Sequence, residues 1–122
     1  MITVDLEDLK KYEAVLSDPS QPIADRTDSL FCIKAFKEVD AIDSLIRSFH
    51  AEPKSELLKH EICYCLGQMN KTPEHVAKIQ AFLEHVIDEK NQYPEIIVHE
   101  AVEAMGNMND QNSLELLKRF ED

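Results

Sequence analysis

Two short segments of the chain place a histidine beside a glutamate in similar surroundings. His60 and Glu61 lie in KHEICYCLGQM, and His99 and Glu100 lie in VHEAVEAMGNM. In both segments a glycine follows the histidine by 7 residues, with small or apolar residues at helical spacing between them. Imidazole and carboxylate together suit iron, manganese or zinc, and two His with one carboxylate form the facial ligand set of non-haem Fe(II) oxygenases. The pairs therefore indicate a candidate metal site.

The spacing around the two pairs does not support a zinc protease. The H-E-x-x-H motif needs a second histidine four residues after the first. This chain has Tyr64 and Glu103 at those positions. The alternative that carries no chemistry stays open, in which both pairs are surface dipeptides on polar helix faces.

The elements that must position these pairs are helices. Leu, Glu, Lys, Ala and Ile are abundant, and the chain has only 2 Gly. Ser55 is a suitable N-cap, Pro73 suits a first helical turn, and no segment alternates with period two. We expect an all-α fold of about seven helices, over residues 6–16, 24–39, 41–50, 55–69, 73–89, 95–108 and 112–122.

The helices show an internal repeat. When the two motifs are aligned on histidine, Gly67 matches Gly106, and a third copy begins at Thr27 in RTDSLFCIK, where Phe31 matches Tyr64. The copies are 33 and 39 residues apart, which is the period of an α-solenoid built from helix pairs. We therefore predict that the helices carrying Thr27, His60 and His99 lie side by side on one face.

Composition limits the class of protein. The 122 residues suit one small domain, and the net charge of −11 argues against nucleic acid and is compatible with a cationic substrate or basic partner. No apolar run approaches the roughly 18 residues that span a membrane, and the N-terminus lacks the apolar core of a signal peptide. Three cysteines without metal-binding spacing favour a reducing, cytoplasmic location.

The segments LLKHEICYCLGQM and VHEAVEAMG resemble the motifs KHE-x-x-Y-x-LGQM and HEA-x-EA-x-G of the deoxyhypusine hydroxylase family. The similarity runs from about Leu6 to the end of the chain, with DPSQPIADRTDSLFCIK as a less close match. It implies HEAT-like repeats and a cytoplasmic, iron-dependent monooxygenase. That oxidoreductase completes hypusine biosynthesis by hydroxylating deoxyhypusine in a precursor of translation initiation factor 5A, its protein substrate, with dioxygen as co-substrate.

The resemblance also implies roles for individual residues. His60, Glu61, His99 and Glu100 match the metal-binding motifs and are the expected ligands of a di-iron Fe²⁺ centre. Glu61 is alternatively a catalytic carboxylate that orients the cationic substrate side chain. Glu103, on the same predicted helix as His99, is a candidate to support a ligand from behind.

Other residues of the motifs suit packing rather than chemistry. Tyr64, Leu66 and Met105 are expected in the core, because they sit at helical spacing on an apolar face. Gly67 and Gly106 suit close helix packing or a helix cap. Histidines 50, 75 and 85 lie outside the motifs, and we expect them to be structural, with the last two facing away from the motifs.

The chain holds two of the family's four His-Glu motifs, so we expect residues 1–122 to resemble one half, the N-terminal half, of such an enzyme. Three possibilities follow: half of a longer enzyme, a half-sized protein completed as a homodimer, or a relic with little metal affinity. Two other classes stay open. One is a HEAT-like protein-interaction module without catalysis, and the other is a repeat protein similar to bilin lyases.

Overall fold

The computed structural model describes residues 6–108 and Lys118, and these contain no strand. The expectation of an all-α fold is confirmed. The helices are α1 (Leu6–Leu16), α2 (Ile23–Lys34), α3 (Val39–Ala51), α4 (Glu56–Gln68), α5 (Pro73–Asp88) and α6 (Glu95–Asn107), with a 3-10 turn, η1, at Lys90–Gln92. The seventh expected helix, 112–122, lies outside the described residues except for Lys118. Among the described helices, none has the length and hydropathy needed to cross a bilayer.

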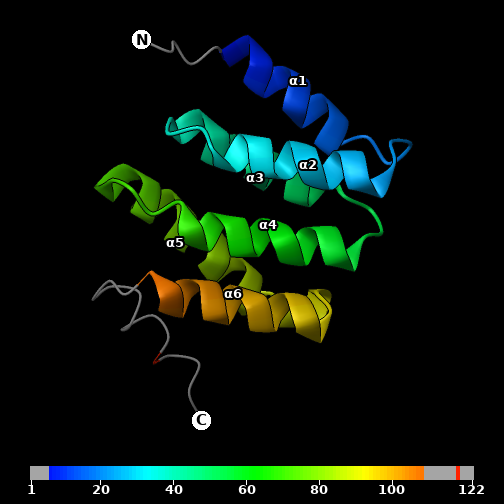
Figure 1. The fold of residues 1–122 in the computed structure, drawn as a ribbon. Helices are drawn as coiled ribbons and strands as arrows, with labels where there is room; N and C mark the ends of the chain where they lie inside the picture. Colours follow the sequence, from blue (N-terminus) through cyan, green and yellow to red (C-terminus); the bar gives the residue numbers. More distant parts are fainter. Residues whose placement is uncertain (1–5, 109–117, 119–122) are drawn as a thin grey trace.

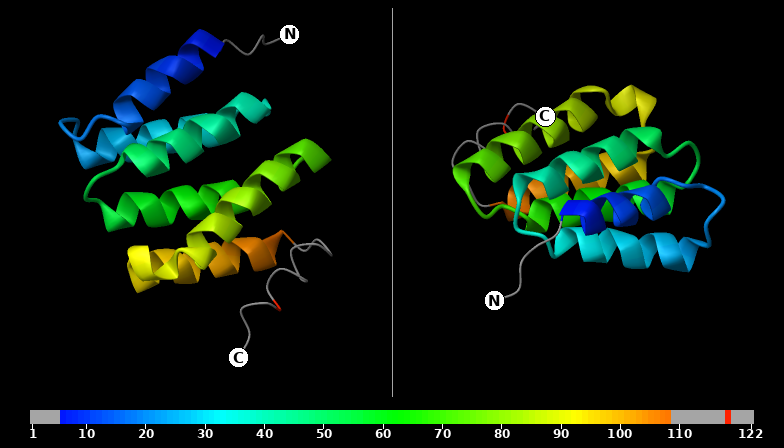
Figure 2. Two further views of the ribbon diagram at one scale, coloured as in Figure 1. Left: turned by 180° about the vertical axis from the view of Figure 1, so that it is seen from behind. Right: turned by 90° about the horizontal axis from the view of Figure 1, so that it is seen from above.

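The helices form two layers of an α-solenoid. Helices α2, α4 and α6 lie side by side in one layer (Figure 1), and α1, α3 and α5 form the second layer behind them (Figure 2). Each consecutive pair is a helical hairpin, and three hairpins stack in sequence order. The prediction that the helices carrying Thr27, His60 and His99 share one face is therefore confirmed.

The core lies between the two layers. Leu66 and Met105 are fully buried, as expected. The expectation for Tyr64 is wrong, because its side chain is exposed. Tyr64 follows His60 by four residues, so it shares the outward face of α4 with that histidine. The largest fully buried side chains come from all of the first five helices: Leu16, Leu30, Ile33, Ile42, Leu45, Phe49, Leu58, Ile62, Leu66, Ile79, Leu83 and Ile87.

Helix α2 is shorter than the expected range of 24–39. It ends at Lys34, where the N–H of Ala35 bonds back to the carbonyl of Cys32 and the N–H of Phe36 to that of Ile33, which tightens the last turn. Glu38 then adopts an extended backbone and begins α3 at Val39. The apolar residues past Lys34 continued the helical pattern in the sequence, which explains the overestimate. The other helix ends differ from expectation by at most two residues.

A buried ion pair joins α2 to the end of α3. Arg26 and Glu52 are both almost fully buried and bind each other directly. Arg26 Nε also donates to the carbonyl of Leu16 at 2.9 Å, and Glu52 accepts from the N–H groups of Lys54 and Ser55. Burial alone would raise the pKa of Glu52, but the hydrogen bonds from Ser55, Arg26 and Lys54 outweigh it and lower that pKa.

Helices α4 and α6 approach each other closely at Gly67. A Cβ atom added to Gly67 would lie 2.8 Å from the Cβ of Ala104 and 3.0 Å from its Cα. Any larger side chain would push against the backbone of α6. The expected role of Gly67 in close helix packing is therefore confirmed.

We predict that Gly67→Ala destabilises the protein. Alanine gains about 1 kcal/mol in helix propensity over glycine, but overpacking against Ala104 costs about 1–3 kcal/mol. Adding Ala104→Gly to the variant vacates the colliding methyl group and should recover part of the loss beyond additivity. Urea unfolding of the two single variants and the double variant measures this coupling. Strictly additive effects would contradict the proposed contact.

Candidate metal site

The two His-Glu pairs occupy the same position of two neighbouring helices. His60 is the fifth residue of α4, and His99 is the fifth residue of α6. The hydroxyl of Ser55 accepts the N–H of Leu58 at 3.1 Å and fixes the start of α4 one turn before His60. Pro94 precedes α6 in the corresponding place. Equal distances from the two helix starts place both pairs in the same register.

The imidazole of His60 lies between two carboxylates. Its Nε2 is 3.1 Å from Oε2 of Glu100 on α6, and its Nδ1 is 3.3 Å from Oε1 of Glu61 on α4. The side chains of His60 and Glu61 are 27% and 29% exposed, whereas that of Glu100 is 8% exposed. The structure therefore brings three of the four predicted ligands together.

Glu100 is the electrostatic centre of this cluster. Burial raises the pKa of its carboxyl, and the nearby charges of Glu103 and Glu61 raise it further, while those of His60 and His99 oppose the rise. A buried carboxylate near two others is unfavourable in a metal-free protein, because its charge is only partly compensated. A cation at this place would relieve that repulsion.

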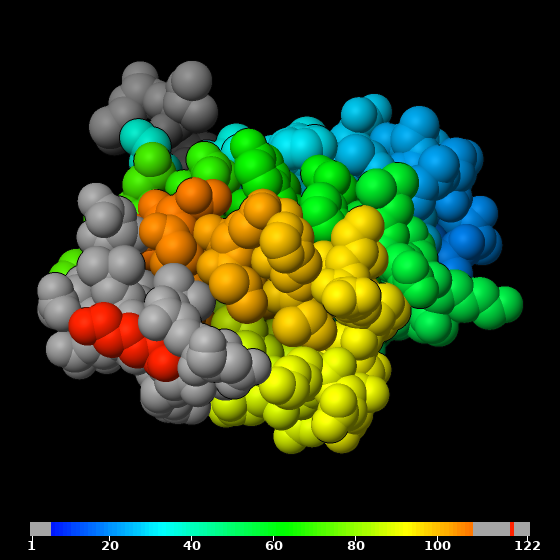
Figure 3. All heavy atoms as spheres, turned by 90° about the horizontal axis from the view of Figure 1, so that it is seen from below, coloured from blue at the N-terminus to red at the C-terminus, as the bar shows by residue number. Residues whose placement is uncertain are grey.

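His99 is held differently from His60. Its Nε2 lies 2.9 Å from Oε1 of Glu103, one turn further along α6, and the two side chains are 71% and 55% exposed. Helix α6 is the last helix of the described stack, and its outer surface lies between α4 and α5 in the view from below (Figure 3). His99 is thus paired within its own helix rather than with the His60 group.

The donor atoms fit a borderline divalent metal such as iron. Imidazole nitrogens and carboxylate oxygens are suitable ligands, and the neighbouring side chains of His60, Glu61 and Glu100 supply both kinds. Within residues 6–108 and 118, no three His, Cys, Asp or Glu side chains are arranged as a coordination set. His60 instead contacts Glu61 and Glu100, and His99 contacts Glu103. Cys63 is fully buried behind this group, and burial, followed by the charge of Glu100, raises the pKa of its thiol to about 12.

Exposed apolar side chains also lie on the layer of α2, α4 and α6, and the sequence pattern did not predict them as part of a site. Leu57 precedes His60 by three residues and Ile96 precedes His99 by three, so the repeat alignment could have found them. The amine of Lys34 lies 5.8 Å and 5.4 Å from the ring centres of Phe31 and Tyr64, which match in the same alignment. The exposed large apolar residues of these three helices are Ile23, Phe31, Leu57, Tyr64 and Ile96.

Comparisons with known proteins point to one family. The chain is 36% identical to deoxyhypusine hydroxylase from Mus musculus over 93% of this chain and 35% of the relative. It is 37% identical to the Homo sapiens enzyme over 86% of this chain and 32% of the relative. The solved structure of human deoxyhypusine hydroxylase in complex with glycerol matches with a TM-score of 0.79 and 34% identity, over 93% of this chain and 37% of that one. No family model matches. The chain spans about one third of the length of these relatives.

We predict that Glu100→Gln stabilises the metal-free protein at pH 7 by about 1 kcal/mol. Folding raises the pKa of the Glu100 carboxyl, so the folded state favours its protonated form. The contribution to stability is complete below the unfolded pKa, near 4.3, and is lost as the pH rises through the folded pKa. Glutamine has no such loss, so the advantage should disappear near pH 4. Urea unfolding in EDTA at both pH values measures it.

The matched control is Glu103→Gln, which removes a more exposed carboxylate from the same helix. It should change stability much less at either pH. If Glu100→Gln is less stable than the wild type at pH 7, the ionised carboxylate is not a source of strain.

Proposed function

Because the chain is related to the deoxyhypusine hydroxylases, we propose that it forms part of an iron-dependent monooxygenase. This cytoplasmic oxidoreductase would hydroxylate deoxyhypusine to hypusine in a precursor of translation initiation factor 5A. The observation that carries the proposal is the group of His60, Glu61 and Glu100, which two repeat-equivalent helices bring together. A generic helical repeat has no structural need for this buried charge.

His60, Glu61, His99 and Glu100 are the residues that would hold iron. When bound, iron supplies the activation of dioxygen, the co-substrate. The chain itself supplies nitrogen and oxygen donors in a cluster of negative charge, and Glu103 contacts His99 from the next turn of α6. A hydrogen-bonded carboxylate of this kind fixes the tautomer and orientation of a ligating imidazole.

The two glutamates of the motifs differ in accessibility, and this separates their roles. Glu100 is almost buried, so a substrate side chain cannot replace its contacts without displacing α4 or α6. Glu61 is nearly a third exposed and contacts Nδ1 of His60. We therefore propose Glu100 as the firmer ligand and Glu61 as the carboxylate that attracts and orients the cationic amine of deoxyhypusine.

The apolar residues beside the site suit the rest of such a substrate. Deoxyhypusine is a long alkyl chain with amino groups, so it needs apolar contact along its length and carboxylates at its charges. Leu57 and Tyr64 flank His60 at one turn before and after it, and Ile96 flanks His99. Packing against these residues would exclude water from the reacting carbon while Glu61 holds the amine.

The first test concerns the ligands. His60→Ala or His99→Ala should abolish iron binding with little change in helical content, because both histidines lie outside the core. Glu61→Ala should retain iron and lose turnover. Iron per chain, measured beside circular dichroism after anaerobic loading, tests all three variants. Full iron content in both histidine variants would contradict the ligand assignment.

A second test concerns the active unit. Two His-Glu pairs offer too few ligands for two irons, so we propose that activity needs the missing half or a second copy of the chain. Analytical ultracentrifugation of iron-loaded protein, combined with a hydroxylation assay, should find turnover only in a dimer or in a mixture with the missing half. A monomer that turns over substrate alone would overturn this proposal.

A second candidate function is a HEAT-like interaction module without catalysis. The exposed apolar side chains on α2, α4 and α6 favour it, because such residues are typical of protein-binding surfaces. The iron measurement separates the two functions. A module of this kind would bind no iron under reducing, chelator-free conditions, whereas a hydroxylase part would bind it through His60 and His99.

A further inference from the structure

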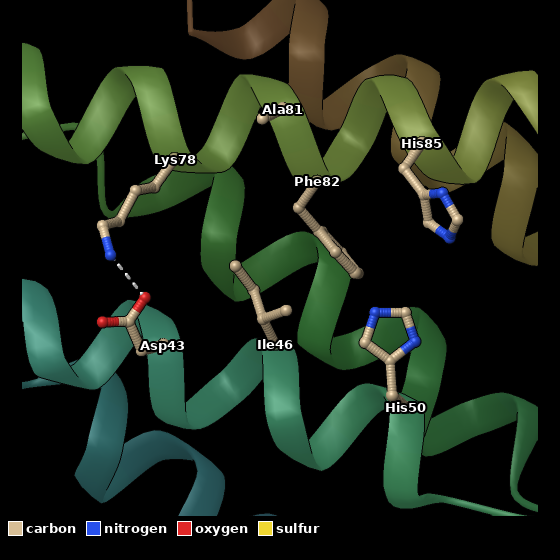
Figure 4. Close-up of a pocket in the computed structure, with 7 residues that line it drawn as sticks. All are labelled: Asp43, Ile46, His50, Lys78, Ala81, Phe82 and His85. Atoms are coloured by element: carbon tan, nitrogen blue, oxygen red, sulfur yellow. Dashed lines mark hydrogen bonds and ion pairs between the residues drawn. The ribbon is translucent and has the colours of Figure 1, made fainter.

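A groove runs between α3 and α5, on the layer opposite to the His-Glu pairs (Figure 4). Its volume is about 470 Å³. One end is closed by an ion pair between Lys78 Nζ and Asp43 Oδ1 at 2.8 Å. The floor is apolar, from Ile46, Ala81 and Phe82, and the other end carries two histidines, His50 and His85.

The two imidazole rings face each other from separate helices. His50 is at the end of α3 and His85 near the end of α5, and both side chains are exposed. Their ring centres are 5.8 Å apart and their planes are inclined by 64°, and Figure 4 shows both rings pointing toward the space between them. With metal–nitrogen bonds of about 2.0–2.1 Å, one ion bound to two imidazoles separates their centres by about 5–6 Å.

The surrounding residues hold both rings in place. The ring of His50 packs edge-on against Phe49 and Phe82, with centres 5.5 Å and 5.8 Å apart. Tyr93 Oη lies 3.5 Å from Nε2 of His85. Partial loss of solvent around the ring, followed by the charges of His85 and Lys59, lowers the pKa of His50, which favours the neutral ring at pH 7. Neutral imidazole is the form that binds metals.

An anion is a poorer occupant of the same groove. Lys78 is the cation that lines it, and its amine is already paired with Asp43. The chain as a whole carries a net charge of −11, which repels anions and attracts cations. Two neutral imidazoles offer lone pairs to a metal but only weak donors to an anion.

We propose that His50 and His85 bind one borderline divalent transition-metal ion, such as Zn²⁺, across the α3/α5 groove, with water completing the coordination. The site is separate from the His-Glu pairs. A bound ion would link the second hairpin of the stack to the third, because α3 and α5 belong to successive hairpins. It would therefore stabilise the packing of one repeat against the next.

The test uses the full chain with His60→Ala and His99→Ala, so that the His-Glu pairs cannot contribute. Zn²⁺ is titrated at pH 7.5 by calorimetry, and the imidazole proton signals are followed by NMR. We expect one Zn²⁺ per chain and shifts of the His50 and His85 signals. The signals of His75 should stay fixed, because its ring is buried against the carbonyl of Lys37 at 2.8 Å.

Variants of the groove decide the assignment. His85→Gln and His50→Gln should each weaken Zn²⁺ binding at least tenfold, and Lys78→Ala, which lines the groove without being a ligand, should leave it unchanged. If His50→Gln does not fold, the exposed His85 decides alone. Absence of Zn²⁺ binding in the parent, or affinity unchanged in His85→Gln, would overturn the proposal.

Discussion

The close contact of α4 with α6 is the constraint on which the candidate site depends. Gly67 has no Cβ, so the backbone of α4 comes within ordinary contact of Ala104 on α6. The histidine of each His-Glu pair lies seven residues before the glycine of the same motif, so the two helices meet in register. This register puts Oε2 of Glu100 within 3.1 Å of the ring of His60. A wider separation of the helices would leave the two motifs as unrelated surface dipeptides.

The charge of the Glu100 carboxylate destabilises the folded protein in the absence of a metal. Glu100 is almost buried, and its pKa is raised by burial and by neighbouring carboxylates. Within residues 6–108 and 118, the other buried carboxylate is Glu52, and it shows the opposite outcome, because Arg26 and two backbone N–H groups bind it and its pKa is lowered. The protein thus compensates one buried charge fully and leaves the other partly uncompensated. Uncompensated charge of this kind is typical of sites that bind a ligand.

Much of the fold could be predicted from the sequence, because the repeat fixes it. The spacing of the three motif copies predicted that α2, α4 and α6 share one layer, and the helix starts at Ser55 and Pro73 follow ordinary capping rules. The end of α2 at Lys34 was missed, because it depends on a tightened turn that apolar periodicity does not reveal. The exposure of Tyr64 was missed for a related reason, since an aromatic residue suits the core equally well by type.

The arrangement of side chains in the site was harder to predict from the sequence. Alignment predicted that the two pairs lie on neighbouring helices, but rotamers decide which atoms meet. His60 reaches across to α6, whereas His99 pairs with Glu103 within its own helix. His60 has Tyr64 at the position that Glu103 takes relative to His99. The ion pair of Arg26 with Glu52 and the facing rings of His50 and His85 join residues 26 and 35 positions apart, outside any repeat alignment.

The most direct measurement is anomalous diffraction at the iron absorption edge from crystals of the chain loaded anaerobically with Fe²⁺. We expect an iron peak between α4 and α6, within about 2.0–2.3 Å of imidazole nitrogens and carboxylate oxygens, with His60, His99 and Glu100 among the ligands. An iron peak elsewhere on the chain, or none at full loading, would contradict the assignment of the His-Glu pairs as a metal site.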